Sequence, residues 1–438
     1  MNIIIAGAGK VGFRLAKTLS IGHHVTVIDR NLDTLNRLQE NLDVLFIHGD
    51  IEDPATYQKL TDQSFNLFIA VTDVDEVNLI STLIVEDVVN VERKFIRLVN
   101  SNFAKSTIKE KLGITEIFFP FELTSKTVEL LLKYPKANNI KHFKHTDFKL
   151  ISVHASKTVE VESLDSDNFS VVGIEREKQF FVPGSTETIL QNDLVYLFGA
   201  EKPILKLCDE LETDVPKRIE RCIVFGAGDL GVSIARVLTE GGKEVRLVDK
   251  DIKLCESAEE KLEGGVLAVS CKYGTTSIFQ EEGFDYADMA IAATDNDEYN
   301  IIKCLEAKEH GIRKVVAVNN ELEYYNLMHA LGIIVVRGPK ISAYNAIIEH
   351  IYSSAVITER IFCGGKGNIF LRMILPQSLL IGKMLKPPKT EVNEAVFLIC
   401  EGRLKALDNK AEGHEGDIIV AIGPKESEAK VKNWIYGL

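Results

Sequence analysis

The 438-residue sequence lacks several features that mark common functional classes. It has no apolar run approaching the roughly 18 to 20 residues that span a bilayer, so we expect no membrane-spanning segment. Basic residues are in deficit: 51 Lys and Arg stand against 64 Asp and Glu, which gives a formal net charge of -13. Because phosphate backbones are bound by a basic face, this excess of acid argues against a nucleic-acid partner.

Patterns typical of metal, hydrolase and P-loop sites are also missing. The seven cysteines are spread along the chain and form no CxxC pair, which argues against a disulfide framework and against a zinc site. The ten histidines show no HxH or HExxH spacing, so we predict no metal. No GxSxG or GxxxxGK(S/T) motif occurs, and we predict no catalytic residues. A start that leads directly into a strand and a glycine loop leaves no room for a signal peptide, so we expect a cytoplasmic protein.

What the sequence does contain is an internal repeat. Four blocks of the first half return in the same order at an offset of about 220 residues. They are IIIAGAGKVG (3–12) and CIVFGAGDLG (222–231), VTVID ending at Asp29 and VRLVD ending at Asp249, LFIAVTDVDEVNLI (67–80) and MAIAATDNDEYNII (289–302), and LGITEIFFP (112–120) and LGIIVVRGP (331–339). The chain is a tandem duplication.

Each repeat alternates short apolar strands with amphipathic segments of helical length. Strands rich in Val, Ile and Leu predict a parallel sheet that is covered on both faces. The segment from about 140 to 212 and the last 75 or so residues instead suggest small β-rich modules with one or two helices. The predicted fold class is α/β, with two tandem Rossmann-like doubly wound parallel sheets, each followed by a small β-rich α+β module.

A glycine loop follows the first strand of each repeat. In the first, Gly7 permits a tight turn, Gly9 lets a pyrophosphate approach the backbone, and Gly12 allows close packing of helix on strand. The helix N-terminus then offers free N–H groups to phosphates. Asp29, at the end of the second strand, can accept two hydrogen bonds from an adenosine ribose. We predict nucleotide binding at this loop, which also includes Ala8, Lys10 and Val11.

Further candidates follow the other strands of the first repeat. Thr72 and Asp73 lie at the carboxyl edge, where ligands bind in open α/β sheets, although TDxDE also resembles a helix cap. Arg97 ends another strand at this edge and could meet either a phosphate or a neighbouring carboxylate. Arg30 could stack on an adenine or lie in solvent, and Asp50 closes an HGD motif.

The second repeat carries the same candidates with some departures. They are Gly226, Ala227, Gly228, Asp229, Leu230, Gly231, Asp249, Thr294 and Asp295. Asp229 replaces Lys10, TyrGlyThr at 273–275 replaces HisGlyAsp at 48–50, and Ala317 is predicted to match Arg97. A carboxylate near a pyrophosphate weakens its binding unless the side chain points to solvent, and the second site is predicted to be the less well equipped one.

The doubled GAGxxG…VxxID…HGD…AVTDxDExN pattern resembles the TrkA family, the cytoplasmic regulatory subunits of Trk potassium uptake systems, built from two tandem RCK (KTN) units. This resemblance covers essentially the whole chain. It implies an RCK N-terminal nucleotide-binding domain (1–120), a connecting helix (121–140) and an RCK C-terminal domain (141–215), followed by a second set at 218–339, 340–362 and 363–438. It also implies binding of NAD(H), with ATP/ADP possible at the same sites.

By the same resemblance, the protein forms a homo-oligomer, either a dimer or a tetrameric ring. It is then peripheral at the inner face of the cell membrane through a potassium-translocating subunit of the TrkH/TrkG type. The interpretation is a nucleotide-sensing, non-enzymatic regulatory subunit. An NAD-dependent oxidoreductase with tandem Rossmann domains is the alternative, and a sensor that acts on a different transporter is a third reading.

Overall fold

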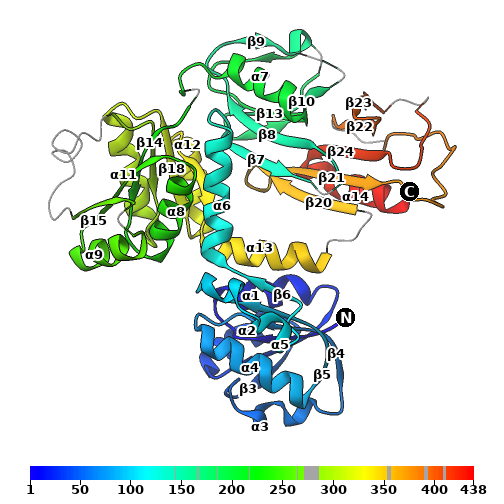
Figure 1. The fold of residues 1–438 in the computed structure, drawn as a ribbon. Helices are drawn as coiled ribbons and strands as arrows, with labels where there is room; N and C mark the ends of the chain where they lie inside the picture. The colour runs from blue at the N-terminus through cyan, green and yellow to red at the C-terminus, as the bar shows by residue number, and fades with distance from the viewer. Residues whose placement is uncertain are drawn as a thin grey trace. The chain divides into compact units, whose positions relative to one another are not determined.

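The computed structural model describes residues 1–438 with the exception of 144, 165, 167, 185, 217, 264, 271–285, 353–356, 389–392 and 408–410. The chain divides into two compact units, and Figure 1 labels the helices and strands along the chain. The first comprises Met1–Thr127, Ala227–Val237 and Val336–Tyr352, and the second comprises Val128–Gly226, Leu238–Val335 and Ser353–Leu438. Within the described ranges, every helix is too short or too polar to cross a membrane.

The first sheet is six-stranded and parallel, with the order β3-β2-β1-β4-β5-β6. Its strands are β1 (Asn2–Ala6), β2 (His24–Asp29), β3 (Leu45–His48), β4 (Ser64–Ala70), β5 (Asn90–Arg97) and β6 (Glu116–Phe118). Its helices are α1 (Lys10–Leu19), α2 (Leu32–Asn41), α3 (Pro54–Tyr57), α4 (Asp75–Val88) and α5 (Ile108–Lys111). The order reverses direction between β1 and β4, which is the point where doubly wound sheets bind ligands.

The apolar run of β1 follows from burial on both faces of this sheet. Ile3 and Ile5 belong to one buried cluster, together with Leu15 of α1. Ile4 and Ala6 point the other way and belong to a second buried cluster. A strand with two buried faces needs apolar residues at every position rather than at alternate ones.

The second sheet has the matching order β16-β15-β14-β17-β18-β19. Its strands are β14 (Arg221–Phe225), β15 (Glu244–Asp249), β16 (Leu267–Ser270), β17 (Met289–Ala292), β18 (Lys314–Asn319) and β19 (Ile334–Arg337). The helices of this repeat are α8 (Asp229–Glu240), α9 (Ile252–Lys261), α11 (Asp297–Glu309) and α12 (Tyr325–Ala330). Two tandem Rossmann-like sheets confirm the predicted fold class.

The two small modules are antiparallel sheets with equivalent strand orders. The first is β11-β10-β13-β8-β7 and the second is β23-β22-β24-β21-β20. The first contains β7 (Asn139–His142), β8 (Phe148–His154), β9 (Val159–Glu160), β10 (Phe169–Arg176), β11 (Gln179–Phe181), β12 (Thr188–Ile189), β13 (Leu194–Ala200) and α7 (Glu201–Leu211). The second contains β20 (Ile357–Phe362), β21 (Gly367–Met373), β22 (Ala395–Cys400), β23 (Arg403–Ala406), β24 (Ile418–Pro424) and α14 (Glu428–Gly437).

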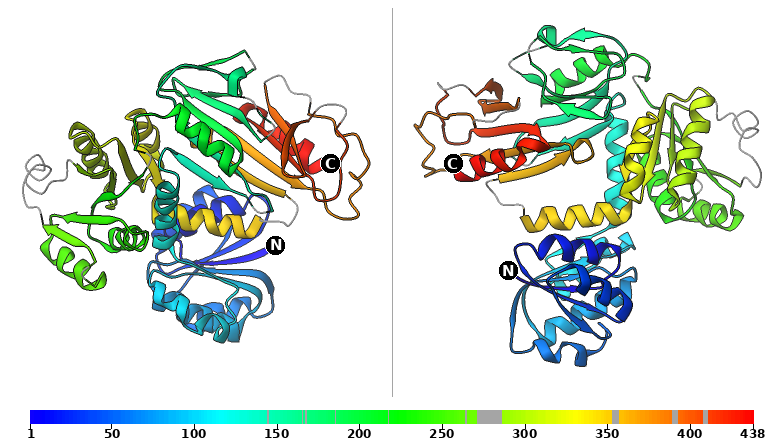
Figure 2. Two further views of the ribbon diagram at one scale, coloured as in Figure 1. Left: turned by 45° about the horizontal axis from the view of Figure 1, so that its top comes forward. Right: turned by 180° about the vertical axis from the view of Figure 1, so that it is seen from behind.

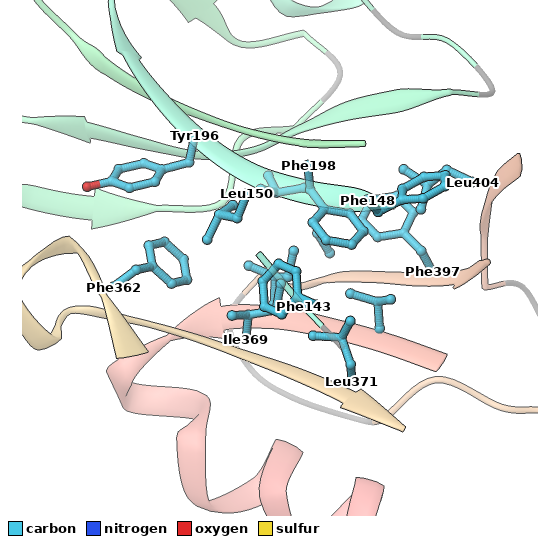
Figure 3. Packing of buried hydrophobic residues seen from close by; sticks show 14 of the residues in the cluster. Phe143, Phe148, Leu150, Tyr196, Phe198, Phe362, Ile369, Leu371, Phe397 and Leu404 are labelled. Carbon is cyan, nitrogen blue, oxygen red and sulfur yellow. The ribbon is translucent and has the colours of Figure 1, made fainter. Parts of the chain in front are cut away.

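The two modules share one hydrophobic core, which the sequence did not predict. Figure 3 shows Phe143, Phe148 and Phe198 of the first module facing Ile369 and Leu371 of the second. Each of these side chains is at most 7% exposed. Burying a large apolar side chain contributes about 2 kcal/mol, so this shared core stabilises the contact between modules within the chain.

Two further helices, α6 (Pro120–Lys133) and α13 (Pro339–Tyr352), follow the last strands of the two parallel sheets. α13 packs along α1, where the Tyr344 hydroxyl lies 2.7 Å from Thr18 Oγ1 (Figures 1 and 2). α6 in turn contacts α8, with Ser125 Oγ 2.7 Å from Ser233 Oγ. Each of these helices therefore contacts the first Rossmann helix of the other repeat.

Lys314 on β18 caps the C-terminal end of α6 from inside the second unit. Its Nζ donates to the carbonyls of Leu131 (3.1 Å), Pro135 and Ala137 (3.3 Å), and the residue is 1% exposed. Helix C-termini leave carbonyls without intrahelical partners, and a lysine can satisfy them.

We therefore expect Lys314→Met to lower the free energy of unfolding by about 3 kcal/mol, because it leaves buried carbonyl groups unsatisfied. Urea unfolding followed by circular dichroism measures this change. The exposed lysine of α9 provides the control, since Lys253→Met should change stability by less than about 0.5 kcal/mol. An equally small effect of Lys314→Met would contradict the capping role.

Burial lowers the pKa of Lys314 to about 7. Between about pH 7 and the ordinary pKa of a lysine side chain, Lys314 carries more protons in the unfolded chain than in the folded chain. Stability should therefore rise with pH from about 7 to about 10, and the penalty should be greatest below pH 7. The difference in stability between the wild type and Lys314→Met, measured across this range, isolates the contribution of the lysine.

Candidate functional site

The first glycine loop joins β1 to α1 and has the geometry that its spacing predicted. Gly7 has a φ of +103°, a conformation that other residues rarely adopt. A Cβ on Gly12 would lie 1.8 Å from the carbonyl oxygen of Gly7, so only glycine fits at this position. A Cβ on Gly9 would meet no atom within 4 Å, because this residue faces open space. The loop is tight at its ends and open at its centre.

Asp29 is held at the end of β2 by two backbone groups. Its Oδ2 accepts a 2.6 Å hydrogen bond from the N–H of Ala8 in the glycine loop, and its Oδ1 accepts a 2.7 Å bond from the N–H of Asn31. Each carboxylate oxygen has a second lone pair, so both can accept further hydrogen bonds. The arrangement fixes the carboxylate beside the loop and leaves it able to receive ribose hydroxyls.

A cavity that is partly open to solvent lies at this carboxyl edge. Of the residues predicted from the sequence, those that line it are Gly7, Gly9, Lys10, Val11, Asp29, Arg30, Asp50, Thr72 and Asp73. Ala8, Gly12 and Arg97 lie outside the lining. Sequence reasoning missed the apolar part of the wall, which comprises Ile28, Ile51, Val71, Val74 and Val77, and it also missed Glu52 and Lys340.

Arg97 binds a carboxylate rather than projecting into this cavity. Its Nη1 donates to Asp73 Oδ1 and to the carbonyl of Thr72, both at 2.7 Å, and the residue is 4% exposed. Of the two partners considered for Arg97, the structure shows the neighbouring carboxylate. The guanidinium fixes Asp73 and the Thr72 backbone at the rim of the cavity.

Asn78, in the first half of α4, clamps the loop that carries Thr72. Its Oδ1 accepts from the Thr72 N–H (2.9 Å) and hydroxyl (2.7 Å), while its Nδ2 donates to the carbonyls of Thr72 (3.0 Å) and Arg97 (2.8 Å). The second repeat reproduces this clamp, with Asn300 bound to both backbone groups and the hydroxyl of Thr294. The repeated asparagine of TDxDExN was the signal in the sequence, but no role was predicted for it.

The alternative interpretation of TDxDE, in which the threonine or the first aspartate caps the following helix, is wrong in both repeats. It fails for Thr72 and Asp73 and for Thr294 and Asp295. The residue that precedes α4 is Val74, which provides no side-chain cap. In the second repeat, the side chain of Asn296 caps α11 by accepting from the N–H of Tyr299. The threonines instead hold the loop through the asparagine clamp.

We expect Asn78→Ala to destabilise the chain by about 2 to 3 kcal/mol, because Asn78 is fully buried and its loss leaves several backbone groups unpaired. Nucleotide affinity should fall with it, since Thr72 and Asp73 line the cavity. Thermal unfolding and a binding titration measure the two effects. The exposed Asn102→Ala is the matched control, and equal behaviour of the two variants would contradict the clamp.

The second repeat reproduces several elements of this site. Gly226 has a φ of +110°, and Asp249 Oδ1 accepts from the N–H of Asp251 (3.0 Å), as Asp29 does from that of Asn31. Asp229 is the first residue of α8, as Lys10 is of α1. The predicted departure at 273–275 lies outside the described residues.

The predicted match of Arg97 with Ala317 is off by one residue. Ala70 pairs with Ile96 in the first sheet, whereas the equivalent Ala292 pairs with Ala317 in the second. Val318 therefore lies where Arg97 lies, and its carbonyl accepts from Asn300 as that of Arg97 does from Asn78. The shift arises because the repeats differ by short insertions. The side-chain amide of Asn320 donates to the carbonyl of Thr294 (3.0 Å), as Arg97 donates to the carbonyl of Thr72 in the first repeat.

Elsewhere among the residues that the structure describes, one group of side chains has ligand atoms close enough to hold a metal ion. Cys400, His414 and Asp417 present these atoms within 4.8 Å of one another. Asp417 Oδ2 also accepts a 2.9 Å hydrogen bond from the backbone N–H of His414. Cys400 is distant in the sequence from His414 and Asp417, so the three residues form none of the short ligand spacings by which metal sites are recognised in a sequence.

The fold and the first cavity together define the class of protein. A glycine loop with open space at its centre, an acid at the end of β2 and a cavity at the carboxyl edge are the features of a Rossmann-type nucleotide-binding protein. This one is duplicated in tandem.

The chain belongs to the TrkA-N domain family, which matches residues 3–120 and 222–339. It is 26% identical to the Trk system potassium uptake protein TrkA homolog of Archaeoglobus fulgidus, over 88% of each chain. It is also 26% identical to the Trk system potassium uptake protein TrkA of Vibrio alginolyticus, over 82% of this chain and 80% of that protein.

Solved structures confirm the architecture. The GsuK RCK domain matches all of this chain and 95% of its own length with a TM-score of 0.60 and 17% identity. The GsuK channel bound to NAD matches with a TM-score of 0.60 and 18% identity, over all of this chain and 79% of its own. At these identities the likeness establishes a shared fold.

Proposed function

We propose that this protein is the nucleotide-sensing regulatory subunit of a potassium uptake system of the Trk type. The observation that carries the proposal is the cavity bounded by the glycine loop and Asp29, in a chain that contains the TrkA-N domain twice. Relatives that align over most of both chains are named as Trk potassium uptake proteins. The protein would act at the inner face of the membrane through a potassium-translocating partner of the TrkH/TrkG type.

The proposed ligand is NAD(H), with ATP or ADP possible at the same place. Adenosine would lie against the apolar wall, with its ribose on Asp29 and its phosphates at Gly9 and Lys10. One solved structure of the same fold is described as a channel bound to NAD, and another as GsuK bound to ADP. The second repeat would bind more weakly because Asp229 stands where the first has Lys10.

Regulation would proceed through the domains without chemistry. We assign residues 1–120 and 218–339 to nucleotide-binding domains, 121–140 and 340–362 to connecting helices, and 141–215 and 363–438 to RCK C-terminal domains. In a dimer or tetrameric ring, a nucleotide would shift the equilibrium between two domain arrangements by its difference in affinity for them. The partner would respond to that shift by opening or closing.

The rival reading is an NAD-dependent oxidoreductase, which the glycine loop and Asp29 also suggest. Hydride transfer to a carbonyl substrate needs a proton donor near the nicotinamide. Among the described residues that line the cavity, Lys10 and Lys340 carry amines that can donate such a proton. Turnover of NADH with carbonyl substrates therefore distinguishes a dehydrogenase from a sensor.

Reconstitution tests the proposal. The full chain should co-purify with a Trk-type potassium-translocating subunit, and NADH or ATP should change potassium flux into vesicles that contain both proteins. Flux that is the same with and without nucleotide would contradict the proposal. Co-purification with a different transporter would support the third reading, a sensor that acts on another membrane protein.

A further inference from the structure

The first cavity receives one lysine from the second repeat. Lys340 is the second residue of α13 and lines the cavity together with the glycine loop of the first repeat. More than 200 residues separate it from the rest of the lining in the sequence. It lies in the same compact unit as the whole of that cavity.

α13 is anchored firmly enough to place this lysine. Ile347 is fully buried in the hydrophobic cluster that covers one face of the first sheet. The ring of His350 packs edge-on against Phe95 and Phe118, with centroids 5.6 and 5.7 Å away. With the bond between Tyr344 and Thr18, these contacts fix the helix over two turns, so the position of Lys340 follows from packing.

The lysine is only loosely engaged by protein groups. Its Nζ lies 3.6 Å from Asp73 Oδ2, and its side chain is 46% exposed. Asp73 already accepts a 2.7 Å bond from Arg97 through its other oxygen. A half-exposed ion pair at this distance contributes at most about 1 kcal/mol, so a phosphate can replace the carboxylate at little cost.

The carboxylates of Asp29, Asp50, Glu52 and Asp73 line the cavity as well, so an anion is favoured only at the position where the N-termini of α1 and α13 each present a lysine. Neither α1 nor α13 has an acid in its first turn, and each has a lysine there, Lys10 and Lys340. A cation at a helix N-terminus opposes the helix dipole, and a bound anion relieves that repulsion. The glycine loop provides the third element of an anion site, because Gly9 leaves the approach to α1 open.

The first repeat has no lysine at the position that corresponds to Lys340. Its connecting helix α6 begins at Pro120, as α13 begins at Pro339, so Phe121 is the residue that corresponds to Lys340. A phenylalanine cannot bind a phosphate. The contribution of a lysine is therefore a property of the second repeat alone.

We propose that Lys340 binds the phosphate group farther from the adenosine in the first cavity, and that it makes this cavity selective for dinucleotides and nucleoside di- and triphosphates over monophosphates. The proposal rests on the proposed nucleotide-binding function. Because Lys340 belongs to α13, ligand binding would also tie the connecting helix of the second repeat to the first cavity.

A titration of the full chain with AMP, ADP, ATP and NADH tests this proposal. Lys340→Met should weaken ADP, ATP and NADH binding about tenfold and change AMP binding by less than about twofold. Lys340→Arg, which keeps the charge, should recover most of the affinity. Lys126→Met, on the exposed face of α6, is the control and should change nothing.

The titration separates the role of Lys340 from nucleotide binding itself. Equal losses for AMP and ADP, or no loss for any ligand, would overturn the role of Lys340 while leaving nucleotide binding intact. If the wild type binds none of the four nucleotides, the proposed function itself fails. Hydrogen exchange offers a second measurement: NADH or ATP should increase protection along α13 in the wild type and in Lys126→Met, but not in Lys340→Met. Equal protection in all three would count against the link between the repeats.

Discussion

Replacing Asp29 with alanine should weaken nucleotide binding to the first cavity by about 100-fold. The carboxylate would accept the ribose hydroxyls, and charged hydrogen bonds of this kind contribute about 1.5 to 3 kcal/mol each. The same change removes the acceptor for the N–H groups of Ala8 and Asn31, so the glycine loop loses a support as well. Isothermal titration of NADH and ATP into the intact chain measures the loss.

Two further variants sharpen this prediction. Asp29→Asn keeps the size of the side chain, but its amide group would face a backbone N–H on at least one side, so it should bind almost as poorly as alanine. Asp249→Ala, the counterpart in the second repeat, should leave the first cavity unchanged. An Asp29→Ala variant that binds every nucleotide like the wild type would show that the site is assigned to the wrong residues.

Alanine at Gly12 and alanine at Gly9 should affect different properties of the protein. The first should impair folding, and the second should impair nucleotide binding. Gly12→Ala places a methyl group 1.8 Å from the Gly7 carbonyl oxygen, so the loop or the helix must move. We expect a loss of at least about 3 kcal/mol in the free energy of unfolding. Urea denaturation of the purified variant measures it.

Gly9→Ala should instead fold normally and bind poorly. Gly9 has a φ of -61° and a ψ of -172°, which alanine adopts readily, and its Cβ would meet no protein atom. That Cβ would occupy space which the phosphates need to reach the backbone. The melting temperature should change little while nucleotide affinity falls at least tenfold. A Gly9→Ala variant with wild-type affinity would exclude this loop as the phosphate site.

The local features of the site could be predicted from the sequence because each depends on a few neighbouring residues. GxGxxG fixes a turn, an opening and a close contact within six positions. Asp29 follows from the position of the second strand. The alternation of apolar strands and amphipathic helices was enough to predict both parallel sheets, since a strand buried on two faces is apolar at nearly every position.

The remaining features depend on contacts between distant segments, which leave no local pattern. Lys340 reaches the first cavity only because α13 packs on α1, and nothing in its own neighbourhood indicates that contact. The shared core of the two small modules could not be predicted for the same reason. Phe198 and Ile369 each have the sequence surroundings of an ordinary strand residue. The match of Arg97 to Ala317 failed for a different reason, since short insertions shift the register between otherwise similar repeats.

The central claim is that this chain binds adenine nucleotides without transforming them. Equilibrium dialysis of the full chain against NADH and, separately, ATP, followed by chromatography of the recovered nucleotide, tests it most directly. We expect saturable binding that is lost in Asp29→Ala, with each ligand recovered unchanged after hours of incubation. Recovery of oxidised or hydrolysed nucleotide in amounts that grow with enzyme-like turnover, or no saturable binding of either ligand, would contradict it.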